Sequence, residues 1–206
     1  MCMGASTGIG SGLSLFNTTR KVVVFMGDST FFHAGLPGLI NAIFNRHNVT
    51  MIVMENGTTA MTGHQDHAAS GRNFNAETDR IPIRSVLEGL GVDPIFETDT
   101  YQQERLADLV KKAVAVDGFS VVIARHPCML KFTREARKKP NYQLRQVDID
   151  QKICERLHTC VAQFGCPTFS RNKDGSVAVN TDLCIGDGSC IQTCPTQAVT
   201  TPKIVS

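Results

Sequence analysis

Apolar residues follow two alternating patterns up to about residue 130. Short runs rich in β-branched residues, bounded by Gly, Asn or Asp, predict buried strands, and apolar residues three or four positions apart predict amphipathic helices. Together the patterns predict a parallel sheet with helices on both faces, which is the α/β fold class. The expected strands are residues 21–28, 49–57, 93–99 and 119–127, and the expected helices are residues 35–48, 81–91 and 102–118.

The pattern changes in the last third of the chain. Residues 133–146, "TREARKKPNYQLRQ", are basic and polar and are interrupted by Pro140, which is typical of a solvated linker. From about Val147 onward the chain is rich in cysteine and in loop-forming residues. We therefore expect an α/β domain over residues 1–140 and a small α+β domain over residues 147–206.

A glycine-rich segment near the start, "GASTGIGSG" at residues 4–12, is similar to the glycine turn of short-chain dehydrogenases. That turn binds a dinucleotide only when it follows a strand, and here only three residues precede it. Those enzymes also place Lys four positions after Tyr, whereas Tyr101 and Tyr142 are followed at that spacing by Arg105 and Gln146. We expect a glycine-rich helix packed closely beneath a sheet, and a nucleotide-dependent reductase is disfavoured.

Composition narrows the function classes. The 206 residues are 42% hydrophobic and 19% charged, as in globular proteins, and the net charge of +2 indicates neither nucleic-acid nor membrane binding. The sequence has no apolar run of transmembrane length, and its first residues do not resemble a signal peptide. Of the eight cysteines, six lie between Cys154 and Cys194. Such clustering without an export signal predicts a metal-binding protein of the reducing cytoplasm.

Two polar residues follow consecutive predicted strands. Asp28 ends the first strand and Asn56 ends the second, so both are expected at the carboxyl edge of the sheet, where open α/β sheets bind ligands. Their oxygens, with a backbone carbonyl near Thr58, are ligands that Mg²⁺ accepts. Gly27 and Gly57 would let a diphosphate approach the backbone. An Asp and an Asn at strand ends are also common turn formers, so spacing alone leaves both interpretations open.

Two longer strings carry a family resemblance. "GDSTFFHAGLPGLINA" occupies residues 27–42, and "NGTTAMTGHQ" occupies residues 56–65. The opening Gly-Asp with the later Asn looks like the thiamine diphosphate motif. The full strings resemble the alpha subunits of the indolepyruvate ferredoxin oxidoreductase family, within the 2-oxoacid:ferredoxin oxidoreductase superfamily. The likeness extends from Met3 through Cys128 and continues into the cysteine-rich tail.

The resemblance implies a set of cofactor ligands. Mg²⁺ would be held by Asp28, Asn56 and Thr58. The same three residues would bind thiamine diphosphate together with four further residues. Glu55 departs from the family, which usually has Asp before the Asn, and we expect its side chain to point away from the metal. No residue is assigned to catalysis. The further cofactor-binding candidates are Gly27, Ser29, His33 and His64, although loop histidines are more often surface or hydrogen-bonding residues.

The resemblance also implies an activity and its partners. The family oxidises 2-oxoacids to acyl-coenzyme A and passes electrons through iron–sulfur clusters to ferredoxin. For this chain the resemblance implies an arylpyruvate substrate. Its pyrimidine-activating glutamate lies on a domain upstream of "MGAS", where this chain begins. We therefore expect a fragment or a truncated product that is inactive alone and requires the N-terminal domains and a beta-type subunit.

The tail contains two copies of an incomplete ferredoxin motif, whose full form is C-x2-C-x2-C-x3-C-P. Each copy has three cysteines, and the position of the second ligand is occupied by Leu157 in one copy and by Asp187 in the other. In two-cluster ferredoxins the last cysteine of each motif binds the other cluster. That rule groups Cys154, Cys160 and Cys194 at a first site, and Cys184, Cys190 and Cys166 with Asp187 at a second.

Several alternatives remain open for these cysteines. Leu157 cannot bind iron and His158 is displaced by one residue, so the first site would hold at most a three-cysteine cluster. The tail would then contain one or two iron–sulfur clusters, and three-iron clusters are among the options. Other interpretations are a decayed domain of buried thiols, a four-ligand zinc site, or a ferredoxin-type electron carrier on an α/β domain without thiamine chemistry. Residues expected to have only ordinary structural or surface roles are His47, His67, His126 and Cys128, the last as a buried thiol.

Overall fold

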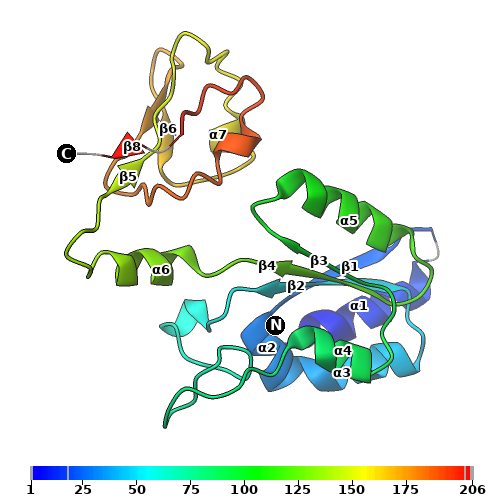
Figure 1. The fold of residues 1–206 in the computed structure, drawn as a ribbon. Coiled ribbons are helices and arrows are strands. Elements are labelled where there is room, and N and C mark those ends of the chain that lie inside the picture. The colour runs from blue at the N-terminus through cyan, green and yellow to red at the C-terminus, as the bar shows by residue number, and fades with distance from the viewer. Residues whose placement is uncertain (1, 18, 202, 205–206) are drawn as a thin grey trace. The chain divides into compact units, whose positions relative to one another are not determined.

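Four parallel strands form the central sheet of the first part of the chain (Figure 1). They are β1 (Val22–Gly27), β2 (Val49–Glu55), β4 (Ser120–Arg125) and β3 (Ile95–Asp99), in that spatial order. Each lies within a segment for which the apolar pattern predicts a strand. Because all four are parallel, their carboxyl ends share one edge of the sheet. The computed structural model describes residues 2–17, 19–201 and 203–204.

Helices cover both faces of this sheet (Figure 1). α1 (Ala5–Phe16), α3 (Leu36–Phe44) and α4 (Ile83–Gly89) lie on one face, and α5 (Gln103–Ala115) lies on the other. The α/β fold class predicted from the sequence is confirmed. α3 is preceded by a short helical turn, α2 (Asp28–Thr30), and by the π-helical segment η1 (Phe31–Gly35), so the chain turns into a helix directly after β1.

Alternating side chains divide the core into two layers. In β2, Val49, Met51 and Val53 are fully buried and pack with the residues of α3 and α4. Ile52 points the other way and packs against Ala113 of α5. A buried parallel strand must be apolar on both faces, which explains why the strand segments are almost continuously hydrophobic.

The glycine-rich segment forms α1, which precedes β1 and contacts it closely. A Cβ atom at Gly10 would collide with the side chain of Val24, so glycine is what allows the helix to approach the strand. The expectation of a glycine-rich helix beneath a sheet is confirmed. The dinucleotide turn is not formed, because these residues are helical rather than a strand-to-helix loop.

The chain divides after Cys128 into two compact units. The second unit begins with α6 (Met129–Ala136), so the first residues of the segment predicted to be a linker are helical. The helix-breaking residue, Pro140, comes only after α6 has ended.

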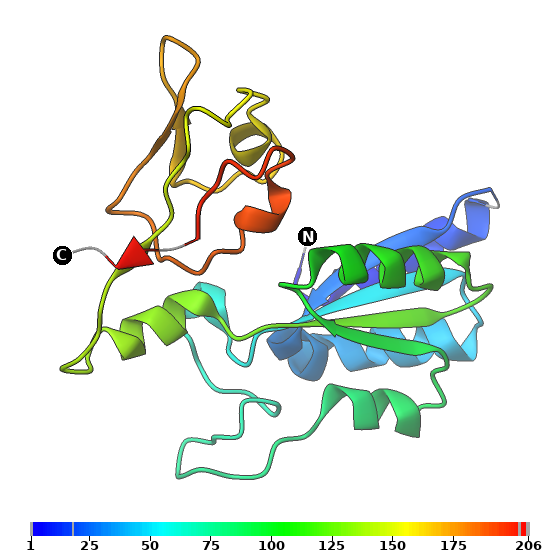
Figure 2. The same ribbon diagram turned by 45° about the horizontal axis from the view of Figure 1, so that its top comes forward.

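The rest of the second unit consists of short elements and long loops (Figure 2). β5 (Arg145–Gln146) pairs with β8 (Lys203–Ile204), and β6 (Phe169–Arg171) pairs with β7 (Val177–Val179), both antiparallel. Its core consists of cysteines together with the apolar residues Val147, Ile149, Phe169 and Val199. The remaining short helices are α7 (Thr159–Ala162) and the 3-10 turns η3 (Ile191–Thr193) and, in the first unit, η2 (Ala60–Thr62). No described helix combines the length and apolarity needed to cross a membrane.

Candidate functional site

The carboxylate of Asp28 joins the ends of two neighbouring strands. It is 1% exposed, directly after β1, and its Oδ2 accepts hydrogen bonds from the backbone amides of Asn56 (2.9 Å) and Gly57 (2.7 Å) beyond β2. Its Oδ1 accepts one from the amide of Ser29 at 2.8 Å. A buried carboxylate is costly unless donors compensate it. The three amides therefore hold a negative charge at the carboxyl edge of the sheet.

Asn56 and Thr58 form a turn beside this carboxylate. The amide of Thr58 donates to Asn56 Oδ1 at 3.0 Å, and the buried Thr58 hydroxyl donates to the carbonyl of Gln65 at 3.3 Å. Asn56 is thus a turn former, as one interpretation of its sequence position supposed. Since an amide oxygen has two lone pairs, this hydrogen bond leaves one for a ligand.

Other predicted cofactor residues gather at the same edge. The Ser29 hydroxyl accepts from the hydroxyl of Thr59 at 2.8 Å and lies 3.2 Å from Nδ1 of the exposed His33. At Gly27 and Gly57 an added Cβ would meet no atom within 4 Å, so the backbone faces open space at both positions. A diphosphate requires this kind of approach to the backbone.

Glu55, the residue that departs from the family, is engaged with a neighbouring strand. Its Oε2 lies 2.9 Å from Nε of Arg125, the last residue of β4. Nη1 of Arg125 also lies 2.7 Å from Oε1 of Glu97 in β3. The carboxylate is therefore neutralised by an ion pair rather than left free beside Asp28.

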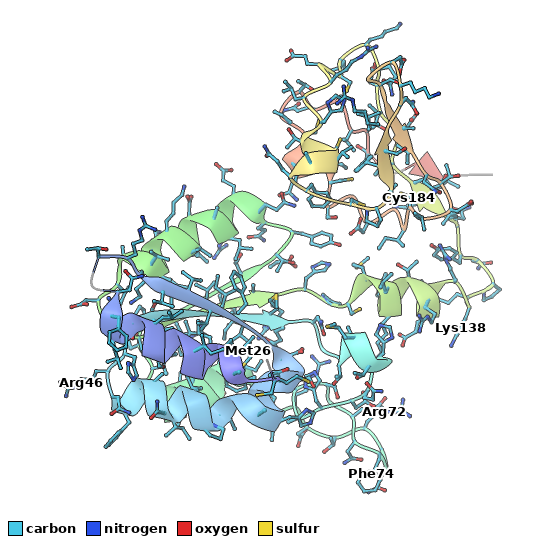
Figure 3. All side chains as sticks on the ribbon, turned by 180° about the vertical axis from the view of Figure 1, so that it is seen from behind. Met26, Arg46, Arg72, Phe74, Lys138 and Cys184 are labelled. Atoms are coloured by element: carbon cyan, nitrogen blue, oxygen red, sulfur yellow. The ribbon has the colours of Figure 1, made fainter. Side chains whose placement is uncertain are left out.

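His67, for which we expected only an ordinary role, is buried against Asp28. Its Nε2 lies 3.3 Å from Asp28 Oδ2, and its imidazole side chain is fully buried. The residue comes from the long loop between β2 and α4, whose outer end carries Arg72 and Phe74 in Figure 3. No periodic pattern marks such a loop, so the sequence contained only a weak signal, the presence of a second histidine soon after His64.

His64 and Cys128 meet on the same side of the first unit. The Cys128 sulfur lies 3.6 Å from His64 Nε2, and the Cys128 amide donates to the carbonyl of Asn56 at 3.0 Å. Cys128 is half-buried, which corrects the expectation of a buried thiol. His64 has a φ of 65°, a left-handed conformation that is strained for histidine.

His126 also has definite partners at this edge. Its Nδ1 lies 3.0 Å from Asp99 Oδ1, and its ring stacks on that of Tyr101 with centroids 3.6 Å apart. Burial raises the pKa of Asp99, but hydrogen bonds from the Tyr101 amide and from His126 outweigh it and leave the pKa below its ordinary value. His47, in contrast, contacts Ser14 near the opposite end of β2.

Three cysteines of the first predicted site face one another. Burial, and then the neighbouring Cys194 and Cys154, raise the pKa of the Cys160 thiol. These three residues line a common cavity of about 20 Å³, with Pro195 and Thr196. At Cys194 burial is opposed by donation from the Thr196 hydroxyl and from nearby amides, and the pKa is lowered. The structure thus brings together the first predicted set.

The second predicted set is also brought together. Burial raises the pKa of Cys190 to about 12, with further contributions from Asp187, Cys166 and Cys184. The Asp187 carboxylate accepts a hydrogen bond from the Ser189 hydroxyl at 3.0 Å. Cys184, labelled in Figure 3, is buried within this unit. Asp187, Cys166 and Cys184 are thus near enough to the Cys190 thiol to affect its pKa.

The two cysteine loops repeat one backbone design at an interval of thirty residues, because Cys154 and Cys184 are equivalent. The amide of Cys154 donates to the carbonyl of Asp150, and that of Cys184 to the carbonyl of Asn180. The side chain of each acceptor residue also accepts a hydrogen bond from the amide two residues later. The distances are 2.9 Å for Asp150 Oδ1 and 3.0 Å for Asn180 Oδ1. The positive φ angles fall at matching positions: Arg156 (58°) and His158 (56°) in one loop, Gly186 (66°) and Gly188 (73°) in the other.

Neither non-cysteine candidate at the first site is placed to bind iron. Leu157 is 59% exposed and has no donor atom. His158 Nε2 lies 2.9 Å from the carbonyl of Gly175, a contact that fixes the ring against the turn between β6 and β7. Of the described residues predicted for the first site, only the three cysteines therefore offer a donor atom to a metal.

In the ranges 2–17, 19–201 and 203–204, no three His, Cys, Asp or Glu residues are drawn together closely enough for a single metal ion. An iron–sulfur cluster has several iron atoms, and its thiolate ligands are spread over them rather than around one centre.

Comparisons with known proteins find a family match in each of the two units. A family profile described as "Thiamine pyrophosphate enzyme, C-terminal TPP binding domain" matches residues 1–124, and one described as "4Fe-4S binding domain" matches residues 177–200. The chain is 34% identical to indolepyruvate oxidoreductase subunit IorA of Archaeoglobus fulgidus over 98% of its own length and 32% of that protein. It is 36% identical to the Thermococcus kodakarensis protein of the same name, over 96% and 33%.

A solved structure shares the fold. A 2-oxoglutarate:ferredoxin oxidoreductase from Magnetococcus marinus superimposes with a TM-score of 0.56 at 21% identity, over 65% of this chain and 51% of that one. The chain spans about a third of the length of the curated relatives it matches.

Proposed function

Because the chain belongs to the thiamine pyrophosphate enzymes through their C-terminal TPP-binding domain, we propose that its first part binds thiamine diphosphate with Mg²⁺. We propose further that it is part of a 2-oxoacid:ferredoxin oxidoreductase. The two domains we propose are those expected from the sequence, residues 1–140 and 147–206. The relatives named indolepyruvate oxidoreductase subunit IorA suggest an arylpyruvate substrate.

The observation that carries this proposal is the buried Asp28 carboxylate at the ends of β1 and β2. Asp28 and Asn56 would each contribute an oxygen to Mg²⁺, with the carbonyl of Thr58 as a third ligand. The open space at Gly27 and Gly57 would admit the diphosphate, while Ser29 and the exposed His33 would border it. His64, on the neighbouring turn, would lie at the boundary of this site.

When bound, thiamine diphosphate supplies a nucleophilic carbon and an electron sink for decarboxylation of a 2-oxoacid. The residues of this chain would hold the cofactor and keep its charge compensated. Three backbone amides donate hydrogen bonds to the Asp28 carboxylate and so compensate its charge at this edge. The six tail cysteines would hold iron–sulfur clusters that carry one electron at a time to ferredoxin.

The two cluster sites would differ in their ligands. Cys154, Cys160 and Cys194 provide three thiolates, which suits a three-iron cluster, because each iron then has one protein ligand. Cys184, Cys190 and Cys166 with Asp187 provide three thiolates and one carboxylate. A carboxylate is a harder ligand than a thiolate, so the iron at Asp187 would be held less firmly.

The complete reaction would require further components. Coenzyme A would accept the acyl group and ferredoxin the electrons, and a beta-type subunit and the domains that precede this region in the relatives would complete the site. We propose the reducing cytoplasm as its compartment, since six clustered thiols would otherwise oxidise.

The central test is thiamine diphosphate binding to the chain, purified anaerobically and measured by calorimetry with and without Mg²⁺. We expect Mg²⁺-dependent binding that Asp28→Ala abolishes and that Asp66→Ala, at an exposed aspartate on the adjoining loop, leaves unchanged. Binding that is independent of Mg²⁺ or of Asp28 would contradict the proposed site.

The second candidate, an electron carrier without thiamine chemistry, is favoured by one observation. All six tail cysteines lie in the second unit, and both sets form without any residue of the first. Iron and acid-labile sulfide in a chain that fails to bind thiamine diphosphate would support this carrier. Thiamine diphosphate binding without iron would instead support a decayed ferredoxin domain.

A further inference from the structure

His67 is the one side chain that the described contacts place against the carboxylate of Asp28. Its imidazole is fully buried and lies with Nε2 3.3 Å from Asp28 Oδ2. The other partners of that carboxylate are backbone amides. A polar imidazole ring is therefore buried at a position where an apolar side chain could fill the same volume.

The proton of this imidazole can be placed from its hydrogen bonds. The amide of Ala69 donates to His67 Nδ1 at 3.2 Å, so Nδ1 is an acceptor and Nε2 carries the proton. Among the residues that the structure describes, the Nε2–H group has no hydrogen-bond partner with good geometry, although it lies 3.3 Å from Asp28 Oδ2. A buried donor without a full hydrogen bond costs about 1–3 kcal/mol. A buried donor of this kind therefore calls for an explanation.

The two oxygens of Asp28 are unequally occupied. Oδ2 accepts from the amides of Asn56 and Gly57, which use its two lone pairs, and the imidazole closes over the same oxygen. Among the described residues, Oδ1 accepts from the amide of Ser29 alone and so keeps one lone pair. The open ligand position of this carboxylate is thus on Oδ1.

We propose that His67 is a positioning residue that keeps Asp28 Oδ2 turned toward the backbone amides, so that Oδ1 presents its free lone pair to a divalent cation. This inference rests on the proposed function, because it supposes that Asp28 is a cation ligand. Partners that orient a metal ligand typically change metal affinity by about 10–100-fold when removed. His67 belongs to this class through its contact with Oδ2.

A packing role is the competing explanation. The ring of His67 stacks on that of Phe32 with centroids 6.3 Å apart and planes inclined by 27°. If packing were the whole role, a leucine would serve nearly as well as a histidine, and a glutamine would have no advantage over leucine. If positioning is the role, glutamine retains a side-chain N–H near the place of Nε2 and leucine does not.

Cation binding separates the two roles. The probe is Mn²⁺ with thiamine diphosphate, and the free ion is counted by electron paramagnetic resonance in the wild-type chain, His67→Leu, His67→Gln and His47→Leu. His47 is the matched control, because it contacts Ser14 away from Asp28. We expect His67→Leu to bind Mn²⁺ about 10–100-fold more weakly, His67→Gln to recover most of the affinity, and His47→Leu to match the wild type.

The outcomes distinguish failure of this inference from failure of the proposed function. Equal Mn²⁺ affinity in the wild type and His67→Leu, or equal loss in His67→Leu and His67→Gln, would reject the role of His67 alone. If the wild-type chain takes up no Mn²⁺ that depends on Asp28, the proposed function is rejected and the role of His67 falls with it.

A second measurement needs neither cation nor cofactor. Long-range ¹⁵N–¹H correlation spectra of ¹⁵N-histidine-labelled chain should show His67 with its proton on Nε2, and Asp28→Asn should shift the Nε2 resonance. A proton on Nδ1 would overturn the inference, because a bare Nε2 would face the carboxylate with a lone pair.

Discussion

The loops at residues 154–160 and 184–190 have the same backbone conformation but reach it through different residues. Gly186 and Gly188 adopt positive φ without a Cβ penalty, whereas Arg156 and His158 adopt it at a cost of roughly 1–2 kcal/mol each. The first loop offsets that cost with side-chain contacts: Arg156 donates to the carbonyl of Asp174 at 2.8 Å, and His158 lies 2.9 Å from the carbonyl of Gly175. The same fold can therefore be specified by conformational freedom or by tertiary contacts.

The loops also differ at the position of the missing cysteine. Leu157 provides no ligand, while Asp187 provides a carboxylate within a group of three thiols. If the proposed function is correct, the same backbone design would support two metal sites with unequal ligands. The two loops share a backbone conformation but differ in their candidate ligands. Substitutions can therefore change the conformation and the ligands independently.

Gly186→Ala should have the largest effect on this comparison. A Cβ at Gly186 would collide with the backbone of Arg145, and φ is +66° there, so we expect a loss of about 2 kcal/mol or more in unfolding free energy. Urea denaturation of the chain measures it. Gly175→Ala is the control, because its φ is +83° but a Cβ would meet only the Arg156 side chain at 3.9 Å, so about 1 kcal/mol is expected. Equal losses would show that the collision is relieved by a backbone shift.

Ligand replacement should equalise the two metal sites. Leu157→Cys should add about one iron per chain at the first site, because a fourth thiolate completes the ferredoxin motif. Asp187→Cys should slow the loss of iron from the second site under mild oxidation, since a thiolate holds that iron more firmly than a carboxylate. Iron and sulfide are assayed before and after exposure to air.

Asp182→Cys, which adds a thiol to an exposed residue outside the motif, is the matched control for these variants. If it protects iron as well as Asp187→Cys does, the benefit is not ligation. No iron in any variant would reject the clusters, and oxygen-stable iron in both the natural chain and Asp187→Cys would remove Asp187 from the ligands.

Arg156→Gly should have a smaller effect, because two contributions oppose each other. Glycine relieves about 1–2 kcal/mol of left-handed strain, but the variant loses the hydrogen bond to Asp174, worth about 1 kcal/mol, and makes the unfolded chain more flexible. We expect the denaturation midpoint to move little. A large loss would show that the Arg156 contact, rather than the loop backbone, maintains the first loop.

A pH dependence of the iron-free tail is a further expectation, confined to alkaline pH. The pKa of Cys190 rises from its ordinary 9.0 to about 12, chiefly through burial. Between these values the unfolded chain has released the proton and the folded chain retains it, so stability should fall as pH rises from about 9 to about 12. Urea midpoints across that interval should decline less steeply in Cys190→Ala than in Cys2→Ala. Equal slopes would mean that Cys190 is not protected by burial.

The sequence alone determined the elements whose apolar patterns are regular. The four strands and the helices α3, α4 and α5 occur where periodicity predicts them, because burial on one or both faces imposes that periodicity on the residues themselves. Asp28 and Asn56 were identified by their places after two such strands. The cysteine groups followed from motif spacing, because a short ligand loop has few ways to direct several thiols at one site.

Only the tertiary structure brought His67 to Asp28 and His64 to Cys128. Both histidines come from the long loop between β2 and α4, which has little regular structure and no apolar repeat to indicate its path. The left-handed conformations of Arg156 and His158 were equally invisible, since local propensity opposes them and contacts with the turn between β6 and β7 maintain them. Local sequence specifies conformation where each residue gains from its own burial, whereas contacts between distant loops depend on a chain path that only the folded whole defines.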